Sequence, residues 1–142
     1  MCRDQKYFIS LVSVISCCLL FISFTSEKDQ DTPKPWNIPE AYESMENPFT
    51  EDEDLMDIGK SLYKKHCVSC HGSEGLGDGA KADELETYPG DFTADEYWNQ
   101  RDGHKYFKSF IGRDEMPNFE KKITNEEDRW ALIMYINSLY DS

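Results

Sequence analysis

The sequence predicts an all-α domain over residues 51–142, and three observations lead to this prediction. Apolar residues recur at helical spacing near both ends of this stretch. A helix-start pattern, Thr124-Asn125-Glu126-Glu127, precedes the last apolar series, as a capping box does. Segments that could form strands are few and short, and the sequence has no internal repeat. A chain of 142 residues has room for one such domain together with a targeting segment and a tether.

The first helix is predicted over residues 53–66. Its apolar residues lie at helical spacing: Leu55, Ile58, Leu62 and Tyr63. Acidic residues at 51–54 come at its start, where negative charge interacts favourably with the helix dipole. Two shorter helices are expected at 94–100 and 103–111. The second of these has an apolar face formed by three aromatic residues: Tyr106, Phe107 and Phe110.

The last helix is predicted over residues 125–139. Its apolar residues follow the i, i+3, i+4, i+7 pattern of an amphipathic helix: Leu132, Tyr135, Ile136 and Leu139. Between the first helix and the middle ones, four glycines fall within residues 72–79. This composition is too flexible for regular structure, so we expect a loop that other parts of the molecule hold in place.

Residues 1–26 are predicted to be a signal peptide or a membrane anchor. Residues 7–24 are apolar or small, follow the basic residues Arg3 and Lys6, and precede a charged run. Basic residues before such a segment favour a cytoplasmic N-terminus, so the rest of the chain would lie outside a bacterial cytoplasmic membrane. Retention as an anchor and cleavage as a signal are both open. Lipidation of Cys17, in a sequence that resembles a lipoprotein box, is a third possibility.

Residues 27–50 are predicted to be a semi-rigid tether, because prolines are spread among polar residues without helical or strand periodicity. The whole chain carries 28 acidic and 15 basic residues and a formal charge of -13, and the acidity belongs to the part after residue 26. No basic stripe is available for phosphates, which excludes nucleic-acid binding. A partner protein is expected to dock through a basic patch.

Cys67-Val68-Ser69-Cys70-His71 has the C-x-x-C-H pattern by which a haem is attached covalently. Two thiols three positions apart can form thioethers with the two vinyl groups on one porphyrin edge, and the histidine that follows can ligate the iron. A zinc site would need a second pair of ligands, which the remaining cysteines and histidines do not supply. A thioredoxin-like pair would need a strand before it in an alternating β/α pattern, which is also missing.

Met116 is expected to be the second axial ligand of the iron. It lies in a turn between Gly112 and Pro117, where its sulfur can point inward without disturbing a helix. The other methionines after the N-terminal segment lie in the tether or in predicted helices: Met45, Met56 and Met134. A thioether ligand favours Fe(II) and raises the reduction potential. His104 is the alternative ligand, and it would give a bis-histidine centre of lower potential. Four residues are candidates for hydrogen bonds to a haem propionate: Tyr88, Trp98, Arg101 and Tyr106.

Residues 54–139 resemble the class I cytochrome c family. The resemblance is carried by the haem motif with its glycine-rich continuation, by Met116-Pro117 followed by Phe119, and by the closing helix. It implies an all-α fold in which the first and last helices cross, with Gly59 packed on Tyr135 and Tyr63 nearby. It also implies one haem c per chain, attached to Cys67 and Cys70 and ligated by His71 and Met116.

The expected function is the transfer of single electrons between a donor and an acceptor protein on the outer face of the membrane. The chain would act as a free carrier or as a subunit of a respiratory complex or a larger oxidoreductase. An electron carrier needs no catalytic base or nucleophile, so no residue is assigned a catalytic role and the chain is not expected to be an enzyme by itself. Two alternatives are open: a haem protein with an open sixth position, which binds a small ligand or reduces peroxide, and a haem-free thiol-disulfide module.

Overall fold

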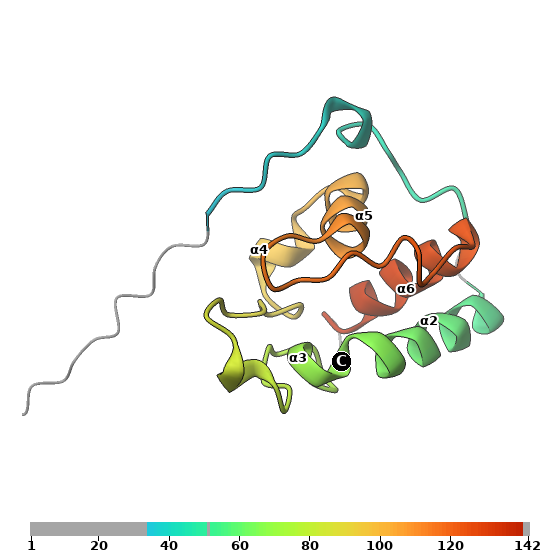
Figure 1. Cartoon of the computed structure of the whole chain (residues 1–142). Helices are drawn as coiled ribbons and strands as arrows, with labels where there is room; N and C mark the ends of the chain where they lie inside the picture. Colours follow the sequence, from blue (N-terminus) through green and yellow to red (C-terminus); the bar gives the residue numbers. More distant parts are fainter. Residues whose placement is uncertain (1–33, 51, 141–142) are drawn as a thin grey trace, which may run out of the picture. The chain divides into compact units, whose positions relative to one another are not determined.

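The computed structural model describes residues 34–50 and 52–140, which form one unit beginning at Lys34 (Figure 1). This part of the chain is helical and contains no strand, as the sequence predicts. The elements follow in the order η2 (Glu40–Tyr42), α2 (Glu53–His66), α3 (Val68–His71), η3 (Ala82–Glu84), α4 (Asp95–Trp98), α5 (Asp102–Ile111) and α6 (Glu126–Ser138). The predicted signal or anchor lies outside the described residues. No helix within the described ranges has the length and apolar character needed to cross a membrane.

Helices α2 and α6 pack against each other and form the largest contact between elements (Figure 1). A Cβ atom on Gly59 of α2 would lie 2.1 Å from the carbonyl oxygen of Ala131 and 2.8 Å from Cβ of Tyr135, both on α6. Only glycine allows the two backbones to approach so closely. The ring of Tyr63 lies 5.3 Å from that of Tyr135. The predicted crossing at Gly59 is therefore confirmed.

The helix boundaries agree closely with the predicted ones, apart from one capping residue. Asp52 caps α2, since its carboxylate accepts a hydrogen bond of 2.8 Å from the backbone N–H of Leu55. Helix α6 starts one residue later than a capping box at Thr124 would require. Its N-cap is Asn125, whose side-chain oxygen accepts from the N–H of Glu127 at 3.0 Å. Asparagine is at least as good an N-cap as threonine, which accounts for the shift.

The main core lies where α2, α5 and α6 meet. Its largest fully buried side chains come from these three helices: Trp130, Tyr63, Phe110 and Ile133. Cys67, at the end of α2, belongs to the same cluster of buried residues. The haem motif is therefore built into the core rather than placed on an outlying loop.

Residues 34–47, which fall in the predicted tether, pack along α5 in the structure. We refer to them as the strap. Helix η2 of the strap contacts α5, and the ring of Tyr42 lies 4.9 Å from that of Phe107. The backbone N–H of Gly103 donates a hydrogen bond of 3.0 Å to the carbonyl of Met45. The strap thus lacks helical or strand periodicity because it is mostly coil, and its contacts with α5 fix it in place.

Candidate functional site

The haem motif forms a single helical turn at the end of α2. Cys67 caps α2, and the backbone N–H groups of Cys70 and His71 donate to its carbonyl at 3.1 and 2.9 Å. Residues at positions i, i+3 and i+4 of a helical turn lie on the same side. Cys67, Cys70 and His71 are therefore brought together by local structure alone, as the spacing predicts.

His71 is buried, with 6% of its surface exposed. Its ring stacks on Phe92, with centroids 4.5 Å apart and planes 21° apart. Burial lowers the pKa of His71 to about 4, so its imidazole is neutral at physiological pH. Its Nδ1 atom is buried and makes no hydrogen bond to protein. Neutral imidazole is the form that binds a metal ion, and fixed orientation of the ring by neighbours is typical of such ligands.

The two thiols of the motif differ in their surroundings. Cys67 is 8% exposed within the core, Cys70 is partly exposed, and neither forms a disulfide. Burial, with a smaller effect of Cys70, raises the pKa of the Cys67 thiol to about 12. A reactive thiol-disulfide pair needs a thiol with a lowered pKa. The described residues also hold no group of three or more His, Cys, Asp or Glu side chains suited to a metal ion.

The glycine-rich loop after the motif folds back over α3. The N–H of Gly77 donates to the carbonyl of His71 at 2.9 Å, and that of Gly79 donates to the carbonyl of Cys70 at 3.1 Å. A Cβ atom on Gly79 would lie 2.5 Å from the carbonyl oxygen of Val68. Gly72 and Gly77 have φ angles of 79° and 74°, which other residues adopt at a cost. The glycines therefore hold the turn that carries the two cysteines and the histidine.

Met116 lies in the loop between α5 and α6, as the sequence predicts. Its side chain is partly buried and packs against the cluster of buried residues that contains Cys67. Two of the other methionines are placed elsewhere: Met134 is buried in a second cluster with Leu55 and Ala131, and Met56 packs against that cluster. Met116 is thus a loop methionine on the same core as the haem motif.

The secondary candidates are already engaged in other contacts. His104 lies 3.0 Å from a carboxylate oxygen of Glu43, and Arg101 lies 3.3 Å from the same atom. The hydroxyl of Tyr88 donates to the carbonyl of Leu76 at 2.6 Å. The other two are engaged as well: Trp98 stacks on Tyr140, and the hydroxyl of Tyr106 lies 3.0 Å from Nη1 of Arg129. His104 as an alternative axial ligand is therefore disfavoured.

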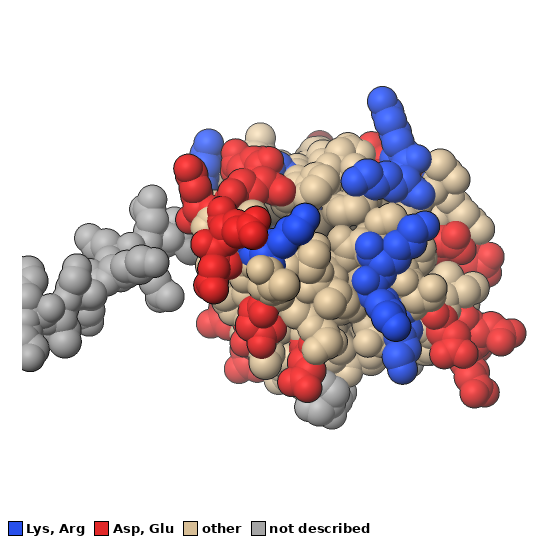
Figure 2. Space-filling model, turned by 60° about the horizontal axis from the view of Figure 1, so that its bottom comes forward, with Lys and Arg blue, Asp and Glu red and all other residues tan. Residues whose placement is uncertain are grey.

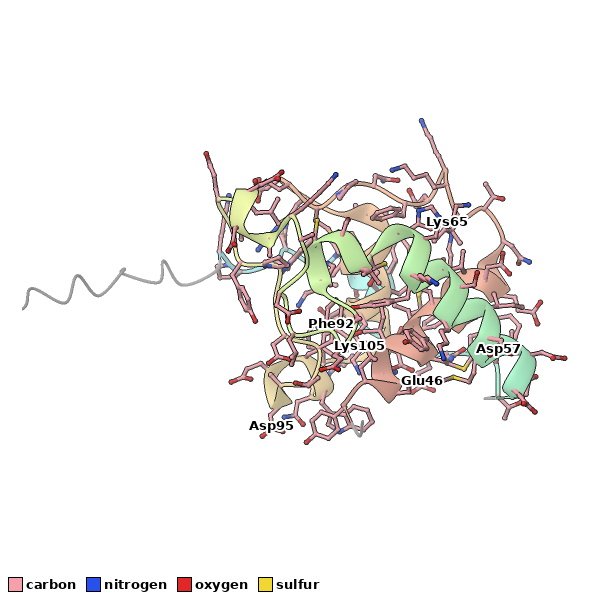
Figure 3. All side chains as sticks on the ribbon, turned by 90° about the horizontal axis from the view of Figure 1, so that it is seen from below. Glu46, Asp57, Lys65, Phe92, Asp95 and Lys105 are labelled. Carbon is pink, nitrogen blue, oxygen red and sulfur yellow. The ribbon has the colours of Figure 1, made fainter. Side chains whose placement is uncertain are left out.

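Sequence reasoning missed the surroundings of His71. Phe92 contacts both His71 and Tyr97, whose hydroxyl is buried without a hydrogen bond. Lys105 is 4% exposed, and its ammonium lies 5.1 Å from the centroid of the Tyr97 ring and donates to Asn137 at 3.0 Å. Phe92 and Lys105, both labelled in Figure 3, are thus linked through the ring of Tyr97. A lysine in a short helix gives no sequence signal of burial, so this cluster was not predictable from the pattern.

Residues 54–136, more than half of the chain, match the family described as cytochrome c oxidase, cbb3-type, subunit III. The chain belongs to this cytochrome family. It is therefore a c-type cytochrome domain with covalently bound haem c, and the resemblance to class I cytochrome c is confirmed. Comparison with curated proteins gives no match.

A chain of known structure is similar to this cytochrome. It is part of the Kuenenia stuttgartiensis reducing HAO-like protein complex Kustc0457/Kustc0458. The two chains match with a TM-score of 0.58 and are 33% identical in sequence. The match covers 65% of this chain and 46% of the other, so the cytochrome spans about half the length of that relative. At this identity the likeness supports the fold of the domain.

Proposed function

We propose that this cytochrome carries single electrons between two redox proteins on the outer face of a bacterial cytoplasmic membrane. Cys67 and Cys70 would hold one haem c, with His71 and Met116 as its axial ligands. When bound, the haem supplies an iron that changes between Fe(II) and Fe(III). The polypeptide has to position these four side chains and keep water away from the iron.

The observation that carries the proposal is the helical turn of the motif, with a neutral, buried histidine. Phe92 stacks on the ring of His71 and fixes its plane, while burial keeps the ring unprotonated. The difference in exposure between the two cysteines indicates which edge of the haem would face the surface. Cys67 points into the core and Cys70 reaches the surface, so electrons would enter and leave beside Cys70.

Basic side chains lie close to the haem motif, although the chain as a whole is acidic. Lys64 and Lys65 lie in the last turn of α2, directly before the motif. Lys65 and Lys122 both lower the pKa of His66, after the larger effect of burial, so both charges lie near it. Figure 2 shows basic side chains gathered on this face, with acidic ones to either side. The partner that docks here would present carboxylates, which reverses the expectation drawn from net charge.

The similar chain of known structure is part of a protein complex. This supports a role for the present chain either as a free carrier or as the electron-transfer subunit of a larger assembly. A haem-free thiol-disulfide module is disfavoured, because burial raises the pKa of the Cys67 thiol. The competing function is that of a haem protein that binds a small ligand or reduces peroxide at an open sixth position of the iron. It follows if Met116 does not ligate the iron.

The first test is an intact mass and an absorption spectrum of the protein isolated from membranes of a host that attaches c-type haem. We expect the mass of the polypeptide plus one haem, and loss of that haem in the double variant Cys67→Ala/Cys70→Ala. The same mass separates a retained anchor, a cleaved signal and a lipidated cysteine. A haem-free product from a competent host would refute the proposal.

Ligation by Met116 is tested in the ferric protein. We expect a charge-transfer band between methionine sulfur and iron that disappears in Met116→Ala and persists in Met56→Ala. Rapid binding of carbon monoxide to the unmodified ferrous protein, without such a band in the ferric form, would instead indicate an open sixth position.

The sign of the local charge is tested with small inorganic oxidants. Opposite charges attract less strongly as salt is added, so oxidation of the reduced cytochrome by ferricyanide, an anion, should slow with ionic strength. Neutralising Lys65 and Lys122 to glutamine should weaken this dependence. If ferricyanide reacts faster with added salt, the net charge governs the approach and the basic docking surface is wrong.

A further inference from the structure

We propose that the strap, residues 34–47, is a clamp that holds the loop carrying Met116, with Arg113 and Trp36 as positioning residues. The proposal extends the function given above, since it takes Met116 as the sixth ligand. It assigns a role to a segment that the sequence marks only as a tether.

The contact between strap and loop is made by the guanidinium of Arg113. Its Nη1 atom donates a hydrogen bond of 3.0 Å to the carbonyl of Pro35, and Nη2 donates one of 2.5 Å to that of Lys34. Its Cζ atom lies 4.0 Å from the centroid of the Trp36 ring. Only 24% of the Arg113 side chain is exposed. A planar, charged fork that is stacked on one side and hydrogen-bonded along its edge is held in a single orientation.

Arg113 is tied to Met116 by a tight turn. The backbone N–H of Met116 donates to the carbonyl of Arg113 at 2.8 Å. Gly112 and Asp114, on either side of Arg113, have φ angles of 69° and 50°, in the left-handed region. A Cβ atom on Gly112 would lie 2.3 Å from the carbonyl oxygen of Met116. The backbone between Arg113 and Met116 has little freedom, so a displacement of Arg113 would move Met116.

The other side of the turn is held by a second anchor. The carboxylate of Glu115 accepts hydrogen bonds from the backbone N–H groups of Glu86 and Thr87, at 3.1 and 2.9 Å. The turn is therefore fixed between the loop before α4 and the strap. If the strap were released, the carboxylate of Glu115 would still hold the turn to the backbone of Glu86 and Thr87.

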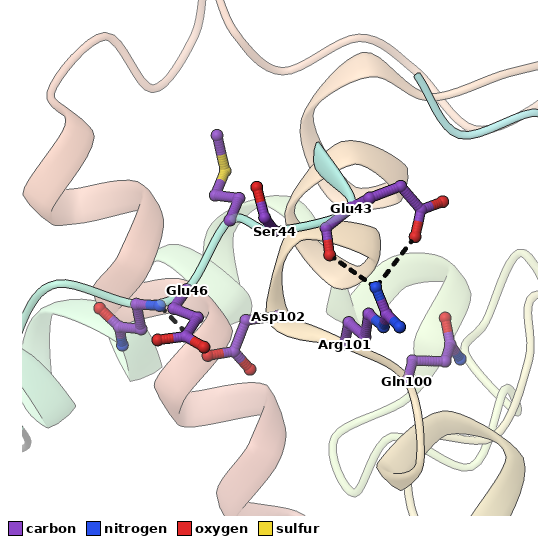
Figure 4. A pocket seen from close by; sticks show the side chains of 8 residues that line it. Glu43, Ser44, Glu46, Gln100, Arg101 and Asp102 are labelled. Carbon is purple, nitrogen blue, oxygen red and sulfur yellow. Dashed lines mark hydrogen bonds and ion pairs between the residues drawn. The ribbon is translucent and has the colours of Figure 1, made fainter. Parts of the chain in front are cut away.

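The strap is in turn fixed to α5. The ring of Trp36 lies 6.2 Å from that of Phe107, and a Cβ atom on Gly103 would lie 2.0 Å from the carbonyl oxygen of Tyr42. Farther along, Glu43 accepts from Arg101, and Asn47 donates its N–H to Asp102 at 3.2 Å (Figure 4). These contacts at both ends make the strap a fixed part of the domain against which Arg113 can be held.

A surface loop opens locally more often when it loses anchors. A loop that carries an axial ligand should then release that ligand more often, and a small molecule should reach the iron more readily. The strap therefore acts on the iron through Arg113 and the loop that carries Met116.

The test compares Trp36→Ala and Arg113→Lys in the haem-loaded full-length protein. Ile58→Ala is the control, since Ile58 is another large apolar residue, 38% exposed, and lies on α2. We expect carbon monoxide to bind ferrous Trp36→Ala and Arg113→Lys at least tenfold faster than the unmodified protein, with a weaker methionine-to-iron band in the ferric form of each. The control should leave both readouts unchanged. Arg113→Lys keeps the charge and removes the fork, so it serves if Trp36→Ala does not fold.

Two outcomes would overturn the proposal, and they differ in what else they affect. If Met116→Ala binds carbon monoxide rapidly while Trp36→Ala and Arg113→Lys both match Ile58→Ala, the strap does not position Met116 but the proposed ligation stands. If the unmodified protein lacks the band and binds carbon monoxide as fast as Met116→Ala, the ligation and the clamp are both wrong.

Discussion

Replacing Gly59 by alanine tests the packing that defines the domain. The added methyl group would lie 2.1 Å from the carbonyl oxygen of Ala131 and 2.8 Å from Cβ of Tyr135, whereas ordinary contacts begin at 3.4 Å. Neither neighbour is the end of a flexible side chain, so the helices themselves must separate, by about 1.3 Å along the first contact. A gap of this size weakens contacts along the whole interface between α2 and α6.

The expected cost follows from two opposing effects. Overpacking of a tight interface typically costs about 3 kcal/mol at its upper range. Alanine in place of glycine inside a helix returns about 1 kcal/mol. The net loss of unfolding free energy is therefore about 2 kcal/mol, which lowers Tm by about 10 °C in a domain of this size.

The assay is denaturant unfolding of the haem-loaded protein, followed by far-ultraviolet circular dichroism and by haem absorption. Lys60→Ala is the control, because Lys60 is adjacent in the same helix and exposed. Its replacement should change stability by less than about 0.5 kcal/mol. A Gly59→Ala protein as stable as the unmodified one would refute the reasoning, since the interface would then accept a methyl group without separating.

Two further predictions concern buried tyrosines. The hydroxyl of Tyr63 donates to the carbonyl of Gly72 at 2.7 Å, so Tyr63→Phe should cost about 1 to 3 kcal/mol in denaturant unfolding; an unchanged midpoint would contradict this role. Burial raises the pKa of Tyr63 and of Tyr97 above the ordinary 10.0. As pH rises, the unfolded chain therefore loses these protons before the folded protein does. The stability that the two tyrosines contribute is complete below pH 10 and is lost as pH rises further. Denaturant midpoints measured on both sides of pH 10 should fall with pH, and less steeply in Tyr63→Phe; a flat profile would show that these hydroxyls are not buried.

The helices and the haem motif were predictable because local sequence determines them. The bounds of α2 agree with the prediction because Asp52 supplies the cap and apolar spacing supplies the buried face. The motif is one helical turn, so spacing alone brings Cys67, Cys70 and His71 together. Placement of Met116 in a loop also follows from its neighbours Gly112 and Pro117.

Contacts between distant segments were not predictable in the same way. Nothing in the sequence around Trp36 indicates that it stacks on Arg113, because the two lie far apart in the chain and the prolines between them suggest only a spacer. The position of Lys105 in a short helix gives no sign of burial, yet only 4% of the residue is exposed and its ammonium lies 5.1 Å from the centroid of the Tyr97 ring and 5.2 Å from that of Trp98. Net charge is limited in a similar way, since a sum over the chain does not record that Lys65 and Lys122 lie near His66.

The contact between α2 and α6 also bears on how the protein is made. Helix α6 is the last element described in the chain, and it supplies many of the buried side chains that enclose Cys67. A chain is synthesised from its N-terminus, so Cys67 stays uncovered until α6 has followed it. The thiol of Cys67 is therefore most accessible to haem before α6 packs on α2 and buries it in the core.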